Sequence, residues 1–161
     1  MLAGASIVGG YLANDGELDL SVVFERLFAA RKTVALPVVL LEERRITFYQ
    51  HAPERALSTG AYGIREPQRD HPIELARVDV LLTPLVAYDD DGHRLGMGGG
   101  YYDRALGALN EADRPVVIGV AHSVQRSADP LPRQAWDVPL DGVLTEHGWQ
   151  PFNRRTHHGD S

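Results

Sequence analysis

The stretch Leu20-Ser-Val-Val-Phe-Glu-Arg-Leu-Phe-Ala-Ala-Arg-Lys-Thr-Val-Ala-Leu-Pro-Val-Val-Leu-Leu41 decides the fold, because the spacing of its apolar side chains changes once along its length. Its first half has the i, i+3, i+4, i+7 spacing of an amphipathic helix, with apolar residues at Leu20, Val23, Phe24 and Leu27. Its second half, Thr33–Leu41, is an apolar run that only Pro37 interrupts. Such a run is typical of a strand covered on both faces in a parallel sheet. A helix followed at once by this kind of strand predicts an α/β fold.

Strands and helices continue to alternate on both sides of this stretch. A helix is expected at residues 101–109, and strands are expected at residues 7–13, 44–49, 78–83, 115–121 and 142–145. Residues 51–77 are rich in Pro, Gly, His and charge, and we expect a long loop there with at most a short helix near residues 53–57. We predict one α/β domain over residues 1–149, with three layers, a mostly parallel central sheet and helices on both faces. Residues 150–161 are expected to form a flexible tail.

The composition excludes several classes of protein. Among the 161 residues, 16 Lys and Arg against 22 Asp and Glu give a net charge of −6, which argues against a nucleic-acid binder with a broad basic surface. The chain has no cysteine, so disulfides, cysteine-ligated zinc and thiol nucleophiles are excluded. No apolar run approaches the ~18 residues of a membrane span, and no basic segment precedes the N-terminal apolar residues as in a secretory signal. We expect a cytoplasmic monomer with no membrane and no nucleic-acid partner.

Residues 89–104, Asp-Asp-Asp-Gly-His-Arg-Leu-Gly-Met-Gly-Gly-Gly-Tyr-Tyr-Asp-Arg, carry the clearest chemical signal. Its closely spaced glycines leave backbone N–H groups uncovered just before a predicted helix, which favours an anion such as phosphate. Arg94 adds a planar, permanently charged group for the same phosphates. A Walker A loop would need Gly-Lys-Ser/Thr where the chain has Gly-Tyr-Tyr, and the dinucleotide motif would need glycine at position 101. The alternative is a flexible turn between a strand and a helix.

The carboxylates near this loop are open to two interpretations. Asp103 falls in the first turn of the predicted helix, where it either stabilises the helix end or holds Mg²⁺ beside the phosphates. Asp137 and Asp141 are either turn residues around Pro139 or possible second Mg²⁺ ligands. Residues 89–92 resemble a calcium loop but lack the glutamate required at its twelfth position, so we expect a solvated turn there. The sequence contains no His-Glu-x-x-His and no Gly-x-Ser-x-Gly pattern, which argues against a catalytic zinc site and a serine hydrolase.

The segment Arg94-Leu-Gly-Met-Gly-Gly-Gly-Tyr-Tyr-Asp103 resembles a motif of the 5-formyltetrahydrofolate cyclo-ligases, also called 5,10-methenyltetrahydrofolate synthetases. Four further segments resemble that family in the same order: Tyr11-Leu-Ala-Asn-Asp-Gly-Glu-Leu-Asp19, Ala35-Leu-Pro-Val38, Tyr62-Gly-Ile-Arg-Glu-Pro67 and Trp136-Asp-Val-Pro-Leu-Asp141. The resemblance covers approximately residues 7–147. A collinear match of this kind is far more specific than any single motif.

The resemblance implies an ATP-dependent enzyme that converts 5-formyltetrahydrofolate to 5,10-methenyltetrahydrofolate through phosphoryl transfer to the formyl oxygen. The ATP-binding residues that it implies lie in the glycine-rich loop: Arg94, Leu95, Gly96, Met97, Gly98, Gly99, Gly100, Tyr101 and Tyr102. Among these, Arg94, Tyr101 and Tyr102 are the implied catalytic residues.

The resemblance also implies a folate site and a Mg²⁺ site. The implied folate-binding residues are Leu12, Glu17, Gly98 and Tyr101. A carboxylate such as that of Glu17 can accept two N–H bonds from the pterin edge. Asp103 and Asp137 are the implied Mg²⁺ ligands. The expected ligands are therefore ATP, Mg²⁺ and 5-formyltetrahydrofolate.

The sequence departs from the family pattern at its start. Members usually begin with a basic helix whose lysine and arginine contact ATP, and Met1 falls where that helix should already have ended. Lys32, the only lysine, follows the first predicted helix and does not replace that residue. The start is therefore either truncated or misassigned, or the chain is a weakened form in which arginines such as Arg126 substitute. A folate-binding module without ATP turnover is the alternative function, and a sugar-phosphate or coenzyme A enzyme of similar build is a third.

Overall fold

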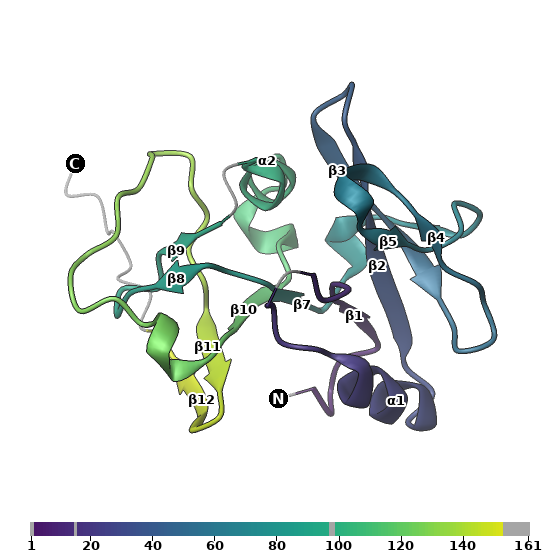
Figure 1. Cartoon of the computed structure of the whole chain (residues 1–161), viewed down its shortest axis with the longest axis horizontal. Coiled ribbons are helices and arrows are strands. Elements are labelled where there is room, and N and C mark those ends of the chain that lie inside the picture. The colour runs from purple at the N-terminus through teal and green to yellow at the C-terminus, as the bar shows by residue number, and fades with distance from the viewer. Residues whose placement is uncertain (1, 15, 97–98, 153–161) are drawn as a thin grey trace.

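A computed structural model describes residues 2–14, 16–96 and 99–152 of the chain. Its main feature is an eight-stranded sheet with the order β12-β11-β10-β7-β1-β2-β3-β6 (Figure 1). Five neighbouring strands are parallel: β11 (Gly142–Thr145), β10 (Val116–Val120), β7 (Val80–Thr83), β1 (Ile7–Gly9) and β2 (Thr33–Leu40). The flanking strands pair antiparallel: β12 (Gly148–Pro151), β3 (Arg45–His51) and β6 (Pro72–Ile73). The prediction of a mostly parallel α/β sheet is confirmed.

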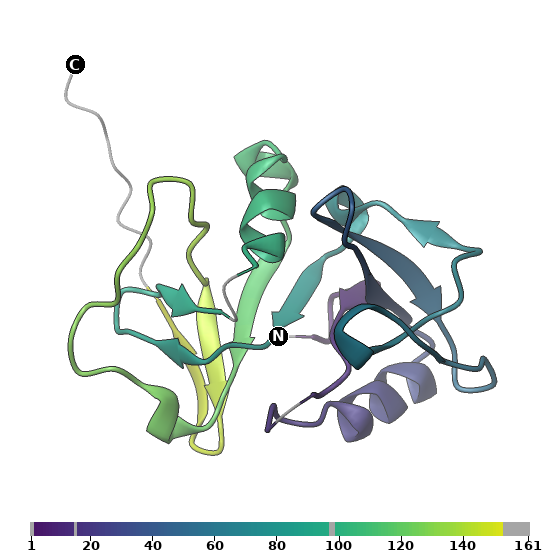
Figure 2. The ribbon, with the colours of Figure 1, turned by 45° about the horizontal axis from the view of Figure 1, so that its top comes forward.

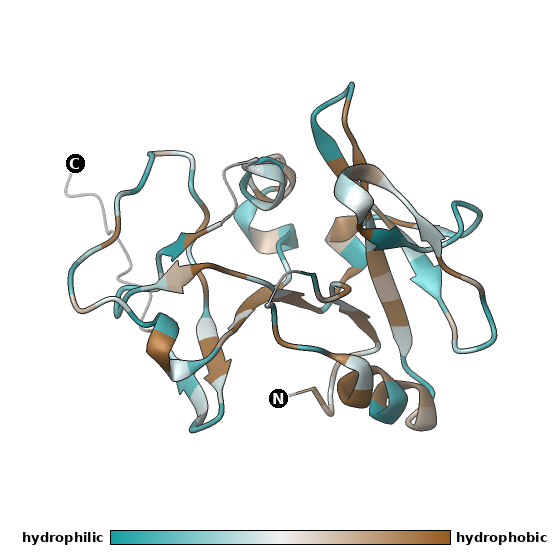
Figure 3. Ribbon diagram, viewed as in Figure 1, coloured by the Kyte–Doolittle hydropathy of each residue, from teal (hydrophilic) through white to brown (hydrophobic). Residues whose placement is uncertain are grey.

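The central strands are apolar because both of their faces are covered. Along β7, Val80 and Leu82 belong to one core cluster and Leu81 to another, as expected when successive side chains point to opposite faces. Helix α1 (Ser21–Ala29) contributes Phe24 and Leu27 to the first cluster, and helix α2 (Tyr101–Gly107) contributes Leu106 to the second. Figure 2 shows the two helices on opposite sides of the strands, and Figure 3 shows the hydropathy of both helices and strands. The described residues thus contain two α-helices, fewer than a full helical layer on each face.

Short elements fill the predicted loop at residues 51–77. Strands β4 (Ser58–Thr59) and β5 (Arg65–Glu66) pair with each other; the 3₁₀ turn η1 (Ala61–Gly63) lies between them, and the 3₁₀ turn η2 (Leu75–Arg77) follows later in the chain. Residues 53–57 form no helix but a turn and a bend, which agrees with the expectation of a loop with at most a short helix there. Further elements are β8 (Ala87–Tyr88), β9 (Arg94–Leu95), η3 (Glu111–Asp113) and η4 (Ser123–Gln125). No described helix is both long enough and apolar enough to cross a membrane.

The C-terminal boundary differs from the expected tail at residues 150–161. Gln150 and Pro151 belong to β12, and Phe152 is buried against Tyr88 with ring centroids 6.5 Å apart. The folded body therefore includes residues 150–152. The remainder of the expected tail lies outside the described residues.

Gly142 in β11 makes room for the indole of Trp149 in β12. A Cβ atom at position 142 would overlap that ring and lie 2.7 Å from the carbonyl oxygen of Gln150. We expect Gly142→Ala to lower the free energy of unfolding by about 1–3 kcal/mol, the usual cost of overpacking, as measured by urea denaturation. Gly4→Ala is the matched control, since a Cβ at position 4 would meet nothing within 4 Å. Equal stability of the two variants would contradict the prediction.

His51, at the end of β3, is expected to make the stability of the fold depend on pH. Its ring packs against Phe28 with centroids 6.2 Å apart, and its Nδ1 atom is buried without a hydrogen-bond partner in the described part of the chain. Burial lowers the pKa of His51 below 6.5; the positive charges of Arg55 and Arg65 lower it further, against the charge of Glu54. The unfolded chain therefore takes up this proton more readily than the folded chain. The contribution of neutral His51 to the free energy of unfolding is fully present above pH 6.5, and it is lost as the pH falls toward the pKa that His51 has in the folded chain.

The difference between wild type and His51→Gln isolates this contribution. We expect the urea midpoint of the wild type to fall more than that of His51→Gln between about pH 7.5 and about pH 5.5, on either side of the ordinary imidazole pKa. Parallel changes in the two midpoints would exclude a role for His51.

Candidate active site

A cleft of about 990 Å³ opens at the carboxyl ends of the parallel strands. Tyr11 follows β1, Pro84 follows β7 and Gln125 follows β10, and all three line it. Helix α2 and the β8–β9 hairpin contribute to one wall, and β2, β3 and the η1–β5 segment contribute to the other. Figures 1 and 2 both show α2 between the β8–β9 and β2–β3 hairpins. Ligands of open α/β sheets usually bind at this edge.

The cleft brings together every site residue implied by the family resemblance that the structure describes. These residues come from three distant segments and all line its surface: Leu12, Glu17, Arg94, Leu95, Gly96, Gly99, Gly100, Tyr101, Tyr102, Asp103 and Asp137. Met97 and Gly98, predicted to contact ATP and, for Gly98, folate, lie outside the described residues. The fold therefore provides one common location for the implied ATP, folate and Mg²⁺ sites.

Arg94 is held in β9 with most of its side chain buried. Only 6% of the side chain is exposed, and its Nη2 donates to Asp103 Oδ1 at 3.0 Å. The guanidinium carbon lies 5.7 Å from the centroid of the Tyr102 ring. Its Nε is buried with no hydrogen-bond partner among the described residues. An unpaired buried donor is costly, so Arg94 is well suited to donate to an anionic ligand.

The β8–β9 hairpin that carries Arg94 is fixed by Asp89. Its carboxylate accepts backbone N–H bonds from Asp91, His93 and Leu131 at 2.9–3.0 Å, and its Oδ2 lies 3.1 Å from His93 Nδ1. Burial alone would raise the pKa of Asp89, but the hydrogen bonds from Leu131 and His93 outweigh it and the pKa is lowered. The expected solvated turn at residues 89–92 is therefore wrong for Asp89, which is 2% exposed.

Asp103 and Asp137 lie on adjoining parts of the wall. Asp103 Oδ1 accepts the backbone N–H of Val138, the neighbour of Asp137, at 3.1 Å. Asp137 Oδ2 accepts the backbone N–H of Gln134 at 2.9 Å, so it also shapes a local turn. Two carboxylates fit Mg²⁺, which prefers hard oxygen ligands and commonly takes only one or two from protein. Asp141 is not part of this wall, because it does not line the cleft and its Oδ2 accepts the N–H of Val117 at 2.7 Å.

Three tyrosines in the cleft keep their protons at neutral pH. Burial raises the pKa of both Tyr11 and Tyr102, and the negative charge of Glu17 raises both further. The pKa of Tyr101 is raised chiefly by the hydrogen bond with Tyr62, whose hydroxyl lies 3.1 Å from that of Tyr101. Neutral Tyr101 and Tyr102 can therefore donate hydrogen bonds to a ligand. Tyr62 has φ 58°, a left-handed conformation that is uncommon for a residue with a side chain.

The segment after β1 contributes Leu12 and Glu17. Glu17 Oε1 accepts the backbone N–H of Asn14 at 2.9 Å, which fixes the carboxylate at the cleft. Its negative charge acts on both Tyr11 and Tyr102, which line the same cleft.

The two cations considered as substitutes for an N-terminal lysine do not line the cleft. Lys32 Nζ donates to the carbonyl oxygens of Ala3 and Ala5, the first at 2.9 Å. Arg126 Nε donates to Asp90 Oδ1 at 2.6 Å. The cleft-lining arginines that sequence reasoning did not single out are Arg65, Arg104 and Arg133. Arg104 follows Tyr101 by three residues on α2, a spacing that places both on one side of a helix and was available from the sequence.

Comparison with known proteins identifies the family. A model of the "5-formyltetrahydrofolate cyclo-ligase family" matches residues 1–146. The chain belongs to that family. It is 40% identical over 144 residues to the 5-formyltetrahydrofolate cyclo-ligase of Escherichia coli K12, covering 88% of this chain and 78% of the relative. The corresponding protein of Haemophilus influenzae is 37% identical over 138 residues, 83% of this chain and 72% of that protein.

Solved structures agree with this cyclo-ligase assignment. The NMR structure of 5,10-methenyltetrahydrofolate synthetase from Aquifex aeolicus has a TM-score of 0.74 and 35% identity, covering 96% of this chain and 78% of that one. The 5,10-methenyltetrahydrofolate synthetase of Mycoplasma pneumoniae has a TM-score of 0.66 and 28% identity, covering 87% and 73%. The resemblance drawn from the sequence is thus confirmed at the level of family and fold.

Proposed function

We propose that this cyclo-ligase converts 5-formyltetrahydrofolate and ATP to 5,10-methenyltetrahydrofolate, ADP and phosphate in the cleft between α2 and the β2–β3 hairpin. One observation carries the assignment to this location. The described site residues that the family resemblance implies, from Leu12 to Asp137, line a single cleft although they are far apart in sequence. Family membership supports the activity itself.

The reaction needs positioning and charge stabilisation more than a covalent nucleophile. The formyl oxygen attacks the γ-phosphorus of ATP, and ADP leaves. N10 then adds to the activated formyl carbon and loses its proton. Departure of inorganic phosphate leaves the methenyl bridge between N5 and N10.

Arg94 supplies the main positive charge of this chain for the phosphates. Its buried Nε lacks a partner in the described structure, and its Nη2 is oriented by Asp103. The backbone of Gly99 and Gly100 approaches the same space without side chains. The neutral hydroxyl groups of Tyr101 and Tyr102 complete a set of donors for the phosphoryl group and the formyl oxygen.

Asp103 and Asp137 would hold Mg²⁺, whose charge would offset that of the phosphate oxygens. Leu12 and Glu17, which line the same cleft, would hold the pterin, with the Glu17 carboxylate accepting N–H groups of its edge. With the phosphates held at Arg94, the formyl group and the γ-phosphorus would then meet within the cleft.

The near-ultraviolet absorption of the methenyl product tests the proposal directly. Purified protein should generate that absorption from 5-formyltetrahydrofolate only when ATP and Mg²⁺ are both present. Calorimetry then separates catalysis from binding alone. Folate binding without ATP binding and without product would replace the proposal with a folate-binding module.

A further inference from the structure

Arg133 lines the cleft, but the side chain that holds it does not. Its Nη1 lies 2.9 Å from Nε2 of His93, the residue that precedes β9. A guanidinium group can only donate hydrogen bonds, so Nε2 of His93 is the acceptor and carries no proton. His93 is therefore a neutral imidazole that holds a permanently charged group.

The other ring nitrogen of His93 faces a buried carboxylate. Its Nδ1 lies 3.1 Å from Oδ2 of Asp89, and the backbone N–H of His93 donates to Oδ1 of the same carboxylate at 2.9 Å. Because Nε2 has no proton, Nδ1 carries it and donates to Asp89. Asp89, His93 and Arg133 thus form a chain of hydrogen bonds that runs from a buried carboxylate to the cleft.

Asp89 also holds the backbone beside Arg133. Its Oδ2 accepts the N–H of Leu131, two residues before Arg133, at 2.9 Å. Figures 1 and 2 both show the segment between η4 and β11 running beside the β8–β9 hairpin. One carboxylate therefore fixes both the segment that carries Arg133 and the imidazole that holds its guanidinium group. An exposed arginine fixed in this way loses less side-chain entropy when it binds a ligand.

The contacts of Arg133 leave its positive charge available. Among the described residues its guanidinium group pairs with no carboxylate, whereas Arg94 pairs with Asp103. The contact with His93 uses one N–H donor of Arg133 and leaves the others for an anion. An arginine of this kind on a cleft surface favours a phosphate or a carboxylate as its ligand.

The neighbours of Arg133 favour a phosphate. The turn at residues 134–137, in which Asp137 Oδ2 accepts the N–H of Gln134 at 2.9 Å, directly follows Arg133 and carries the proposed Mg²⁺ ligand Asp137. At the other end of the hydrogen bond, His93 is followed in the chain by Arg94, the proposed phosphate ligand. Arg133 is thus tied to both segments that would hold the nucleotide and its metal ion.

We propose that Arg133 is a further ligand of the nucleotide phosphates, and that His93 and Asp89 are positioning residues that act through it. This inference rests on the proposed function. Guanidinium groups bind phosphate oxygens through paired N–H bonds. The contact exists both before and during phosphoryl transfer, so it contributes to nucleotide affinity rather than to the rate of transfer. Because Arg133 is exposed, the contribution is modest and falls at raised salt.

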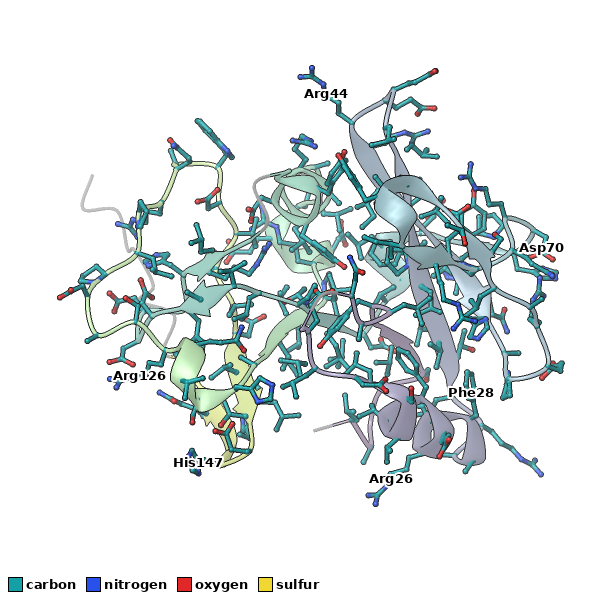
Figure 4. All side chains as sticks on the ribbon, in the orientation of Figure 1. Arg26, Phe28, Arg44, Asp70, Arg126 and His147 are labelled. Carbon is teal, nitrogen blue, oxygen red and sulfur yellow. The ribbon has the colours of Figure 1, made fainter. Side chains whose placement is uncertain are left out.

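Arg133→Gln tests the contact with the nucleotide. We expect this variant to raise KM for ATP about 3–10-fold, as for loss of an exposed ion pair, with kcat and KM for the folate within about twofold of wild type. The matched control is Arg126→Gln, which should keep wild-type values. Arg126 lies on the same segment and pairs with Asp90 of the same hairpin, but it does not line the cleft, and Figure 4 labels it at the outer side of the molecule.

Variants of His93 test the positioning role. His93→Ala should raise KM for ATP by a smaller factor, about 2–5-fold, because Arg133 keeps its charge but loses its fixed orientation. The double variant His93→Ala/Arg133→Gln should match Arg133→Gln, since a residue that acts only through Arg133 has no effect once that arginine is gone. A glutamine amide also offers both an acceptor and a donor, so His93→Gln should return KM toward the wild-type value.

The outcomes separate this inference from the proposed function. Absence of methenyl product with wild type would overturn the function, and calorimetric Kd values for ATP would still decide the role of Arg133. An unchanged Kd for ATP in folded Arg133→Gln would refute the phosphate contact. A rise of KM for the folate alone would also refute it and would assign Arg133 to carboxylates of that substrate. Additive effects in the double variant, together with a lowered urea midpoint of His93→Ala, would reduce His93 to a structural residue.

Discussion

Replacing Arg94 by alanine is expected to lower the turnover of 5-formyltetrahydrofolate by about 10²–10³-fold, the usual loss when one donor that stabilises transition-state charge is removed. The side chain is 6% exposed and already oriented by Asp103, so it offers a preformed donor to the phosphoryl oxygens. The loss should appear mainly in kcat, because charge develops on the phosphoryl oxygens during transfer.

Arg126→Ala is the matched control for Arg94→Ala. Arg126 lies beside the same β8–β9 hairpin, but it pairs with Asp90 and does not line the cleft. Arg94→Lys separates charge from shape, since lysine keeps the charge but not the planar group. Near-normal kcat in folded Arg94→Ala would refute the role of Arg94 in phosphoryl transfer.

Asp103→Asn is expected to lower turnover by about 100-fold at fixed Mg²⁺ and to raise the Mg²⁺ concentration needed for half-maximal rate, because a neutral amide is a far weaker Mg²⁺ ligand than a carboxylate. Asparagine preserves an acceptor for the N–H of Val138 and for Arg94, so the fold should be retained.

Two readouts complete the Asp103 test. Calorimetry of ATP binding with and without Mg²⁺ should show that the metal strengthens binding to wild type much more than to Asp103→Asn. The exposed residue Asp113 in η3 provides the control Asp113→Asn. An unchanged Mg²⁺ dependence, together with an unchanged urea midpoint, would assign Asp103 to orienting Arg94 rather than to the metal.

The sequence predicts the central strands well because strands that are buried on both faces consist of continuous apolar runs. The run at Thr33–Leu41 is observed as β2, and the strand expected at residues 44–49 is observed as β3. The short strands within residues 51–77 could not be predicted, because strands such as β4 and β5 contain only two residues each and therefore show no periodicity. The site residues could be predicted because the family's segments occur in the same order along this chain. The structure shows that these residues, although distant in sequence, line one cleft.

The burial and the hydrogen bonds of some polar side chains could not be predicted from the sequence, because they depend on residues that are distant along the chain. Asp89 has the neighbours of a solvated turn, and its burial depends on the backbone of Leu131, 42 positions away. The contact between Arg104 and the Arg44 carbonyl joins residues 60 positions apart. In both cases a polar side chain is fixed by a backbone group whose position only the tertiary fold determines.

The two outermost strands bear on how this protein behaves at high concentration. Strands β6 and β12 end the sheet, and each includes a proline, Pro72 in one and Pro151 in the other. Proline has no backbone N–H, so it interrupts the row of donors that an exposed edge would offer to a second molecule. With two residues in β6 and four in β12, both edges are also short. The cleft can therefore stay open to large substrates while the sheet that supports it resists edge-to-edge aggregation.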